Sequence, residues 1–221
     1  MSSRRVFLTG ATGYIGSRLA TQLVARGHTV RALVRRGSER KLPAGVEPVA
    51  GDALRAETFA GSMQADDTLV QLVGVAHPSP AKATEFRSVD LASALASFAD
   101  AARARVEHVV YVSVAQPAPA MRAYVAVRAE AEAALAATGL TASVLRPWYV
   151  LGPGHRWPYA LIPLYWSAAL VPSLRDGARR LGLVTIREMV NALVHAVERP
   201  PSERSRVWDV PAIRAAGRSV V

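Results

Sequence analysis

The stretch Thr9-Gly10-Ala11-Thr12-Gly13-Tyr14-Ile15-Gly16 decides the fold, because it joins a short apolar run to the first amphipathic segment. Residues 5–9 predict a buried strand and residues 13–26 predict a helix. Glycines at such a turn leave the backbone N–H groups of the helix N-terminus open to a phosphate. We therefore predict that this loop holds the pyrophosphate of a dinucleotide, and that Gly16 lets the helix pack closely on the strand.

The rest of the chain repeats the alternation of strand and helix. Apolar runs rich in valine and leucine predict further strands at 29–34, 46–49, 68–73, 108–112, 142–145 and 207–210, and the segments between them predict helices at 53–59, 81–105, 121–138 and 187–198. Thr185 and Glu188 form a capping box before the last helix, and Gly139 stands where a left-handed C-cap would follow residue 138. Continuously apolar strands indicate a parallel sheet covered by helices on both faces.

Composition sets the limits on class and location. The 221 residues are 51% hydrophobic and 20% charged, enough apolar surface for a folded core, and the absence of cysteine excludes disulfides, thiolate nucleophiles and cysteine-ligated metal sites. We expect one domain over residues 1–221 and no bound metal. The strongly apolar run at 157–174 is interrupted by Pro158, Pro163 and Pro172, so we expect no stable membrane span and a cytoplasmic location.

The formal charge of +10 comes almost entirely from arginine, since the 27 basic residues include only Lys41 and Lys82 as lysines. Nucleic-acid binding would require the charge to gather on one face with aromatic residues between. The arginines instead run the length of the chain, which favours a solvated basic surface. We therefore expect a small-molecule substrate and no nucleic acid as partner.

The cofactor preference is encoded after the second predicted strand. A dinucleotide without a 2′-phosphate is usually held there by an acidic residue, whereas arginine accommodates the 2′-phosphate of NADP. This strand is followed by Arg35 and Arg36, then by Arg40, with no acid before Glu39. The pattern favours NADP, with NAD as the alternative that chance placement in an arginine-rich chain leaves open.

The Gly-x-x-Gly-x-x-Gly spacing resembles the short-chain dehydrogenase/reductase superfamily, in particular its extended and atypical branches, which include NAD-dependent epimerase/dehydratase-like and NmrA-like NAD(P)H-binding proteins. The stretches that match lie at 51–52, 72–76, 106–113, 145–148 and 152–154, so the resemblance covers about residues 4–154. It implies an α/β Rossmann-like doubly wound sheet, a cofactor-binding core at 1–154 and a reduced substrate or lid region at 155–221. The residues that it places on the cofactor are Gly10, Thr12, Gly13, Tyr14, Ile15, Gly16, Arg35, Arg36, Asp52, Ala53, Val73, Gly74, Val75 and Pro147.

Asp52 has a second interpretation besides the contact with adenine that the resemblance implies. It precedes the predicted helix at 53–59, where a carboxylate can serve as the N-cap. The two roles are compatible.

Catalytic members of the superfamily combine a Tyr-x-x-x-Lys pair on a helix with a small hydroxyl residue after the fifth strand. The matching residues here are Tyr124, Arg128 and Ser113, so arginine replaces lysine, and Val114 stands at the second position of the usual hydroxyl pair. Asp90 stands where an asparagine is common. A guanidinium supplies charge and donors but cannot relay a proton, so proton transfer by Tyr124 would lack its usual partner.

The region after Pro147 is expected to approach the nicotinamide and the substrate. It holds Trp148, Tyr149, His155, Arg156, Trp157 and Tyr159, whose aromatic rings favour a small apolar or aromatic substrate. His155 is an alternative proton carrier, and the apolar segment at 160–171 is a candidate lid.

The sequence thus predicts an NADP(H)-binding oxidoreductase that transfers hydride, present as a monomer or a homodimer. The alternative is a non-catalytic NmrA-like protein that senses NAD(P)H or serves in assembly, because two of the three expected catalytic side chains are altered.

Overall fold

A seven-stranded parallel sheet in the order β3-β2-β1-β4-β5-β6-β9 forms the centre of the computed structural model, which describes residues 3–118, 120–153 and 181–219. Every neighbouring pair in this sheet is parallel, as the continuously apolar strands predict. The strands are β1 (Arg5–Thr9), β2 (Thr29–Val34), β3 (Val46–Ala50), β4 (Asp67–Gln71), β5 (His108–Val112), β6 (Ala142–Leu145) and β9 (Ser205–Trp208).

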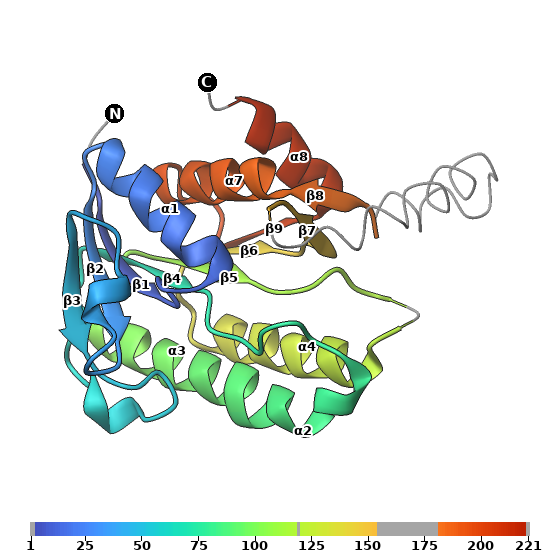
Figure 1. The fold of residues 1–221 in the computed structure, drawn as a ribbon, viewed down its shortest axis with the longest axis horizontal. Coiled ribbons are helices and arrows are strands. Elements are labelled where there is room, and N and C mark those ends of the chain that lie inside the picture. Colours follow the sequence, from blue (N-terminus) through green and yellow to red (C-terminus); the bar gives the residue numbers. More distant parts are fainter. Residues whose placement is uncertain (1–2, 119, 154–180, 220–221) are drawn as a thin grey trace.

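Helices cover both faces of the sheet (Figure 1). On one face lie α1 (Tyr14–Ala25), α7 (Ile186–Glu198) and α8 (Val210–Ser219), and on the other lie α3 (Ala92–Ala104) and α4 (Arg122–Ala137). Each layer has its own apolar core, and the sheet separates the two. The Rossmann-like doubly wound fold predicted from the sequence is confirmed.

The caps of two helices also agree with the sequence. Thr185 accepts a hydrogen bond from the backbone N–H of Glu188, and the Glu188 carboxylate accepts one from the Thr185 N–H, which completes the capping box of α7. Gly139 adopts φ +72° just after α4, the left-handed conformation that glycine tolerates best.

The predicted helix at 53–59 is wrong, because only a 3₁₀ turn at Ala56–Thr58 forms there. The Asp52 carboxylate accepts a hydrogen bond from the Leu54 N–H, and the Thr58 hydroxyl bonds to the backbone of Asp52 and Arg55. These local bonds between side chain and backbone compete with the helical pattern. Asp52 is therefore not the N-cap of a helix.

The predicted helix at 81–105 is divided into shorter pieces. A 3₁₀ turn at Pro80–Lys82 leads into α2 (Ala83–Glu85), and a π-helical turn at Phe86–Leu91 joins α2 to α3. Such π turns are rare and occur often at functional sites. This one carries Asp90 into the interior of the protein, where the residue is 1% exposed.

Among the described strands and α-helices, three were not predicted. Two short strands, β7 (Tyr149–Leu151) and β8 (Leu183–Thr185), pair with each other in a separate parallel ladder. Helix α8 begins after Asp209, whose carboxylate accepts a hydrogen bond from the Ala212 N–H. Residues 181–219, part of the predicted substrate region, supply β9 to the main sheet and α7 to its core, so a substrate role for this region stays a prediction.

Candidate functional site

The predicted site residues gather at one edge of the sheet, where the parallel strands have their carboxyl ends. The sheet continues from β1 to β2 and β3 on one side and to β4, β5 and β6 on the other, so the order of the strands reverses between β1 and β4. In open α/β sheets the loops that follow the two strands at such a point usually form the ligand-binding crevice, and we expect the crevice here.

The glycine loop lies on this crevice with its backbone close to the neighbouring loop. Gly10 has φ +76°, and a Cβ atom there would lie 3.1 Å from the Leu72 carbonyl carbon. A Cβ on Gly16 would lie only 2.1 Å from the Gly10 oxygen, so the helix and the strand approach as closely as predicted. Thr12 and Gly13 are exposed.

The N-terminus of α1 has the features of an anion site. Gly13 is its N-cap and supplies no side-chain hydrogen bond, and the first turn holds no acidic residue. The N–H groups of this turn and the positive end of the helix dipole therefore meet no protein anion from these residues. Negatively charged phosphate oxygens would satisfy both.

Tyr14 and Ile15, the remaining predicted residues of this loop, turn away from the exposed tip. Ile15 packs against the apolar core between the sheet and α7. Tyr14 is half-buried and packs on Gly152 after β7, where a Cβ would lie 2.3 Å from the Tyr14 hydroxyl oxygen. Both side chains therefore hold the loop through contacts with the protein: Ile15 with the apolar core and Tyr14 with Gly152.

A cleft of about 420 Å³ lies at the carboxyl ends of β2 and β3. Its lining includes Arg35, Arg36, Gly51, Asp52 and Thr58. Both arginines are exposed, and Arg40, which was also predicted near the 2′-phosphate, is exposed on the following 3₁₀ turn. Two guanidinium groups beside one carboxylate make this cleft suitable for a group with both phosphate and hydroxyl functions.

The loop after β4 forms the opposite wall of the crevice and is held by a buried acid. The Val75 N–H donates a hydrogen bond of 3.0 Å to Asp90 Oδ2. A Cβ on Gly74 would lie 2.5 Å from Arg128 Nη2 and 2.8 Å from Asp90 Oδ1, so the backbone here rests directly on these two side chains. Val73 and Ala53 are half-buried at the same edge.

Arg128 makes a buried ion pair rather than presenting its charge to solvent. Its Nη2 lies 2.5 Å from Asp90 Oδ1, and its Nη1 donates to the Val112 carbonyl at 2.9 Å and to the Tyr111 hydroxyl at 3.3 Å. Burial disfavours the charged guanidinium, but Tyr124, Tyr111 and Asp90 raise the pKa of Arg128 above its ordinary value. The guanidinium thus stays charged and bound to protein groups.

Tyr124 lies beside this pair on α4. Its ring packs against the Phe86 ring in a tilted contact with 4.9 Å between centroids. The Arg128 guanidinium carbon lies 5.0 Å from the centre of the Tyr124 ring. Tyr124 is half-buried, so one part of the ring still faces solvent. The predicted proximity of tyrosine and cation is therefore present, as a cation–π contact.

Ser113, the third predicted catalytic residue, is buried after β5 with 3% of its surface exposed. Its hydroxyl oxygen has no hydrogen-bond partner within the described part of the chain. The structure therefore brings Tyr124 and Arg128 together but shows no hydrogen bond from Ser113 to either. Val114 is equally buried.

Pro147 is buried after β6, where its carbonyl accepts a hydrogen bond from the Ala115 N–H. Trp148 and Tyr149 follow, with rings in an edge contact at 5.4 Å between centroids. The other predicted substrate residues, His155, Arg156, Trp157 and Tyr159, lie outside the described residues, as does the predicted lid at 160–171.

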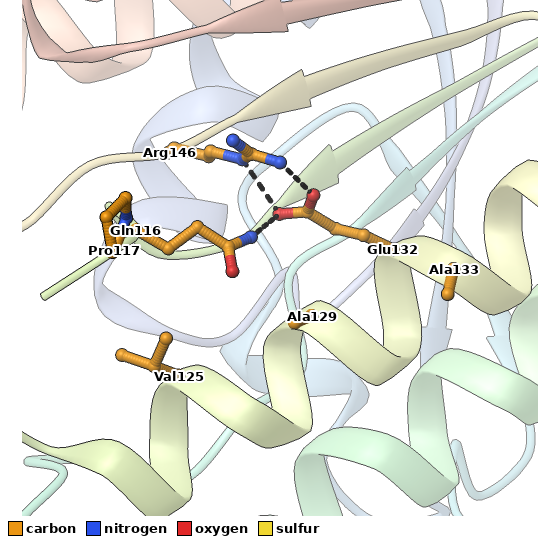
Figure 2. Close-up of a pocket in the computed structure, with 7 residues that line it drawn as sticks. All are labelled: Gln116, Pro117, Val125, Ala129, Glu132, Ala133 and Arg146. Atoms are coloured by element: carbon orange, nitrogen blue, oxygen red, sulfur yellow. Dashed lines mark hydrogen bonds and ion pairs between the residues drawn. The ribbon is translucent and has the colours of Figure 1, made fainter.

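A second cleft, of about 610 Å³, lies between α4 and the loops after β5 and β6 (Figure 2). Glu132 links its walls, since the carboxylate accepts hydrogen bonds from Arg146 and from the Gln116 side chain at 2.9 Å. Val125 and Ala129 supply apolar surface from α4. This clamp ties the loop before α4 to the helix that carries Tyr124.

Sequence analysis missed the pairing of Asp90 with Arg128, although it noted both substitutions singly. The signal available in the sequence was that Asp90 stands at the position of the common asparagine and Arg128 at the position of the usual lysine. An acid and a base that occur together in this pattern can form a buried ion pair. It also missed Thr9 and Gln71, which join by a buried hydrogen bond beneath the glycine loop.

The described part of the chain offers neither a metal site nor a membrane span. The described residues contain no group of three or more acidic or histidine side chains placed to hold a metal ion. None of the described helices is both long enough and apolar enough to cross a membrane.

Comparison with known proteins shows that a family model matches the part of the chain that contains the candidate site. A model of NAD(P)H-binding domains matches residues 10–156. A solved structure of a short-chain dehydrogenase/reductase superfamily protein from Agrobacterium tumefaciens with bound NAD superposes with a TM-score of 0.69 at 16% identity, covering 96% of this chain and 81% of the other.

Two curated proteins are similar at low identity. One is a 4-hydroxy-2-methyl-3-oxo-4-farnesyl-3,4-dihydroquinoline-1-oxide ketoreductase of Stigmatella aurantiaca, 29% identical over 89% of this chain and 65% of its own length. The other is a ceramide reductase of Caulobacter vibrioides, 27% identical over 86% of this chain and 59% of its own length. The chain thus spans roughly three fifths of the length of these relatives.

Proposed function

Because the chain belongs to the NAD(P)H-binding family within the short-chain dehydrogenase/reductase superfamily, we propose that it is an NADP(H)-dependent oxidoreductase that transfers hydride to or from a small apolar or aromatic substrate. The observation that carries the proposal is the crevice at the carboxyl edge. There an uncapped glycine-loop helix, which suits the pyrophosphate, and a cleft lined by Arg35 and Arg36 both lie at the carboxyl ends of neighbouring parallel strands.

The preference for NADP rests on these two arginines. A guanidinium fork matches the oxygens of a 2′-phosphate, whereas the two ribose hydroxyls of NAD need an acceptor. Asp52 lines the same cleft, which fits the predicted contact with the adenosine portion. Ala53 follows it at the same edge.

A titration with NADPH and NADH tests this preference. We expect tighter binding of NADPH, and the double substitution Arg35→Ser/Arg36→Ser should raise its Kd about 30-fold, the effect of about 2 kcal/mol of lost charge-assisted hydrogen bonds, while the Kd for NADH changes less than about threefold. Arg87→Ser is the matched control, because Arg87 is an exposed arginine that pairs with Glu130 of α4 and does not line this cleft. Tighter binding of NADH by the wild-type chain would contradict the assignment.

Two further lines support reduction of a carbonyl group. The two curated relatives are named as a ketoreductase and a ceramide reductase. Both names specify molecules with apolar portions, so they support the apolar character of the proposed substrate but not its small size. Reduction of a ketone of this class is therefore the proposed direction.

Tyr124 is the proposed acid. A bound reduced nicotinamide would supply the hydride, and the Tyr124 phenol would donate a proton to the developing alkoxide oxygen of the substrate. The Arg128 guanidinium carbon lies 5.0 Å from the centre of the Tyr124 ring, so a positive charge stands beside the proposed acid. Ser113 is proposed as a donor to the same oxygen, although its hydroxyl is buried.

The substitution Tyr124→Phe tests the acid. We expect kcat for reduction of aryl ketones by NADPH to fall about 100-fold or more, within the usual contribution of a general acid, with the Kd for NADPH unchanged within about threefold. Phe86, on which the Tyr124 ring packs, would keep its contact, so folding should be preserved. An unchanged rate would remove Tyr124 from catalysis.

A non-catalytic NmrA-like sensor or assembly protein is the second candidate. The buried pairing of Arg128 favours it, because a guanidinium bonded to Asp90 and Val112 has few donors left for a ribose. This candidate predicts different affinities for NADPH and NADP⁺ with no turnover of any ketone. The aryl ketone assay separates the two functions.

A further inference from the structure

We propose that Asp90 and Arg128 act as one positioning unit, which holds the loop at Gly74 and Val75 in the conformation that receives the cofactor. The inference rests on the proposed binding of NADP(H). It assigns Arg128 to the support of the loop rather than to proton relay or to direct contact with the substrate.

A continuous set of buried hydrogen bonds joins the two walls of the crevice. Thr9, at the end of β1, donates to the Gln71 side chain at the end of β4, and the Gln71 amide donates to Ser93 at 3.1 Å. The Ser93 hydroxyl donates to the Asp90 carbonyl at 3.2 Å. Each of these side chains is fully or almost fully buried, so the bonds form away from competing water.

Asp90 continues this network toward the cofactor loop and toward α4. One carboxylate oxygen accepts the Val75 N–H and the other accepts Arg128 Nη2. Arg128 in turn bonds to the Val112 carbonyl at the end of β5. The pair therefore connects the ends of β4 and β5 with the helix of Tyr124.

The two charges depend on each other because both are buried. Arg128 has 7% of its side chain exposed and Asp90 has none. Removing one partner leaves an uncompensated charge in the interior, which is much more costly than removing both. Such a relation predicts strong coupling between substitutions at the two positions.

Gly74 shows that the loop rests on the pair. The gap below its Cα is filled by Arg128 Nη2 and Asp90 Oδ1, so any added methyl group would displace them. Displacement of the carboxylate would also release the Val75 N–H. The position of the loop and the geometry of the ion pair are thus linked by two contacts, the packing of Gly74 on both side chains and the hydrogen bond from Val75 to Asp90.

The test is a double-mutant cycle with Asp90→Asn, Arg128→Gln and the combined variant, read out by NADPH fluorescence titration. We expect each single substitution to raise the Kd about tenfold or more, and the combined variant to be no worse than the weaker-binding single variant. Kd increases that multiply in the combined variant, or an unchanged Kd for Asp90→Asn, would overturn the inference.

Asp67→Asn is the matched control. Asp67 is also a fully buried carboxylate and lies near the Arg31 guanidinium at 3.3 Å, but it begins β4 at the opposite edge of the sheet. The control should lower the unfolding temperature and leave the Kd for NADPH unchanged within about threefold. If Asp67→Asn weakens NADPH binding as much as Asp90→Asn, the effect is general destabilisation and the positioning role is overturned.

Gly74→Ala provides a second test that leaves both charges in place. It should weaken NADPH binding and accelerate hydrogen exchange of the Val75 amide, and Asp90→Asn should accelerate the same amide. Slow exchange of Val75 in both variants would overturn the inference. Failure of the wild-type chain to bind NADPH would instead overturn the proposed function, and the inference with it.

Discussion

Gly16 permits the closest backbone approach in the glycine loop. No side-chain rearrangement can relieve a Cβ placed 2.1 Å from the Gly10 oxygen, because the obstacle is backbone. At the scale of the residue, this position therefore accepts only glycine. The requirement comes from packing of α1 on β1, since no positive φ is recorded for Gly16.

The substitution Gly16→Ala should destabilise the protein by about 3 kcal/mol and abolish measurable NADPH binding, because α1 must move away from the loop. Urea unfolding and NADPH titration measure the two effects. Gly61→Ala is the control, since Gly61 has φ +77° but nothing lies within 4 Å of the added Cβ, and only the left-handed backbone costs about 1 kcal/mol. Equal losses in the two variants would show that packing at Gly16 is unimportant.

At the scale of single residues, sequence reasoning placed the glycines, Arg35 and Arg36 at the crevice, because local patterns dictate turns and strand ends. It could not place Arg128, which the pattern of the superfamily assigns to the catalytic pair. The guanidinium turns inward because Asp90, 38 residues earlier, offers a buried partner. No local spacing reveals such a contact.

At the scale of the element, both a local capping signal and a buried apolar face define helix α7. Its reciprocal cap joins Thr185 and Glu188, and its apolar side is buried against α1, α8 and the sheet. A hydrogen bond from Gln22 to Asn191 crosses from α1 to α7 at 3.0 Å. The start of this helix was predictable because a capping box is a purely local signal.

Thr185→Ala should lower the free energy of unfolding by about 1 kcal/mol, the usual contribution of a helix N-cap, without a change in NADPH affinity. Thermal unfolding should show a decrease of about 3 °C for a chain of this length. Thr185→Ser keeps the hydroxyl and serves as control. A Thr185→Ser variant as unstable as Thr185→Ala would exclude the hydrogen bond as the cause.

The elements that sequence reasoning missed have non-local causes. The π turn at Phe86–Leu91 interrupts a segment whose composition favours an ordinary helix, and Asp90 gains its partners only in the folded protein. The strands β7 and β8 are three residues each and pair across 31 intervening positions. Short segments of this kind take their conformation from tertiary contacts.

At the scale of the whole molecule, one buried histidine makes stability depend on pH. His108 begins β5, is fully buried and shares a hydrogen bond of 3.1 Å with Ser143 on β6. Burial, with a smaller contribution from the charge of Arg4, lowers the pKa of His108 to about 4 from an ordinary value of 6.5. The unfolded chain therefore binds this proton between pH 6.5 and pH 4, while the folded chain does not.

Stability should consequently fall as the pH decreases through this window. Between pH 7.5 and pH 5 the wild-type chain should lose about 2 kcal/mol more of its free energy of unfolding than His108→Gln, which cannot titrate. Urea unfolding at the two pH values measures the difference. Identical pH dependence in the two chains would contradict a neutral, buried His108.

The fold as a whole was predictable because strand and helix periodicity, the glycine loop and the order of matching stretches all agree. The sequence does not define the substrate in the same way, and the candidate substrate residues from His155 to Tyr159 lie outside the described part of the chain. The cofactor side depends on backbone turns, whereas substrate recognition depends on side chains from distant segments. This difference explains why the cofactor class follows from the sequence and the substrate does not.

The packing of α1 against α7 also has a consequence for synthesis on the ribosome. Leu19 and Leu23 of the first helix are completely buried, and the core around them includes residues of α7, such as Leu193 and Val197. A nascent chain that has reached residue 180 must therefore keep an apolar surface exposed until α7 emerges. Premature stop codons before residue 181 are expected to yield chaperone-bound or aggregated fragments, visible in the pellet after centrifugation, rather than a smaller working protein.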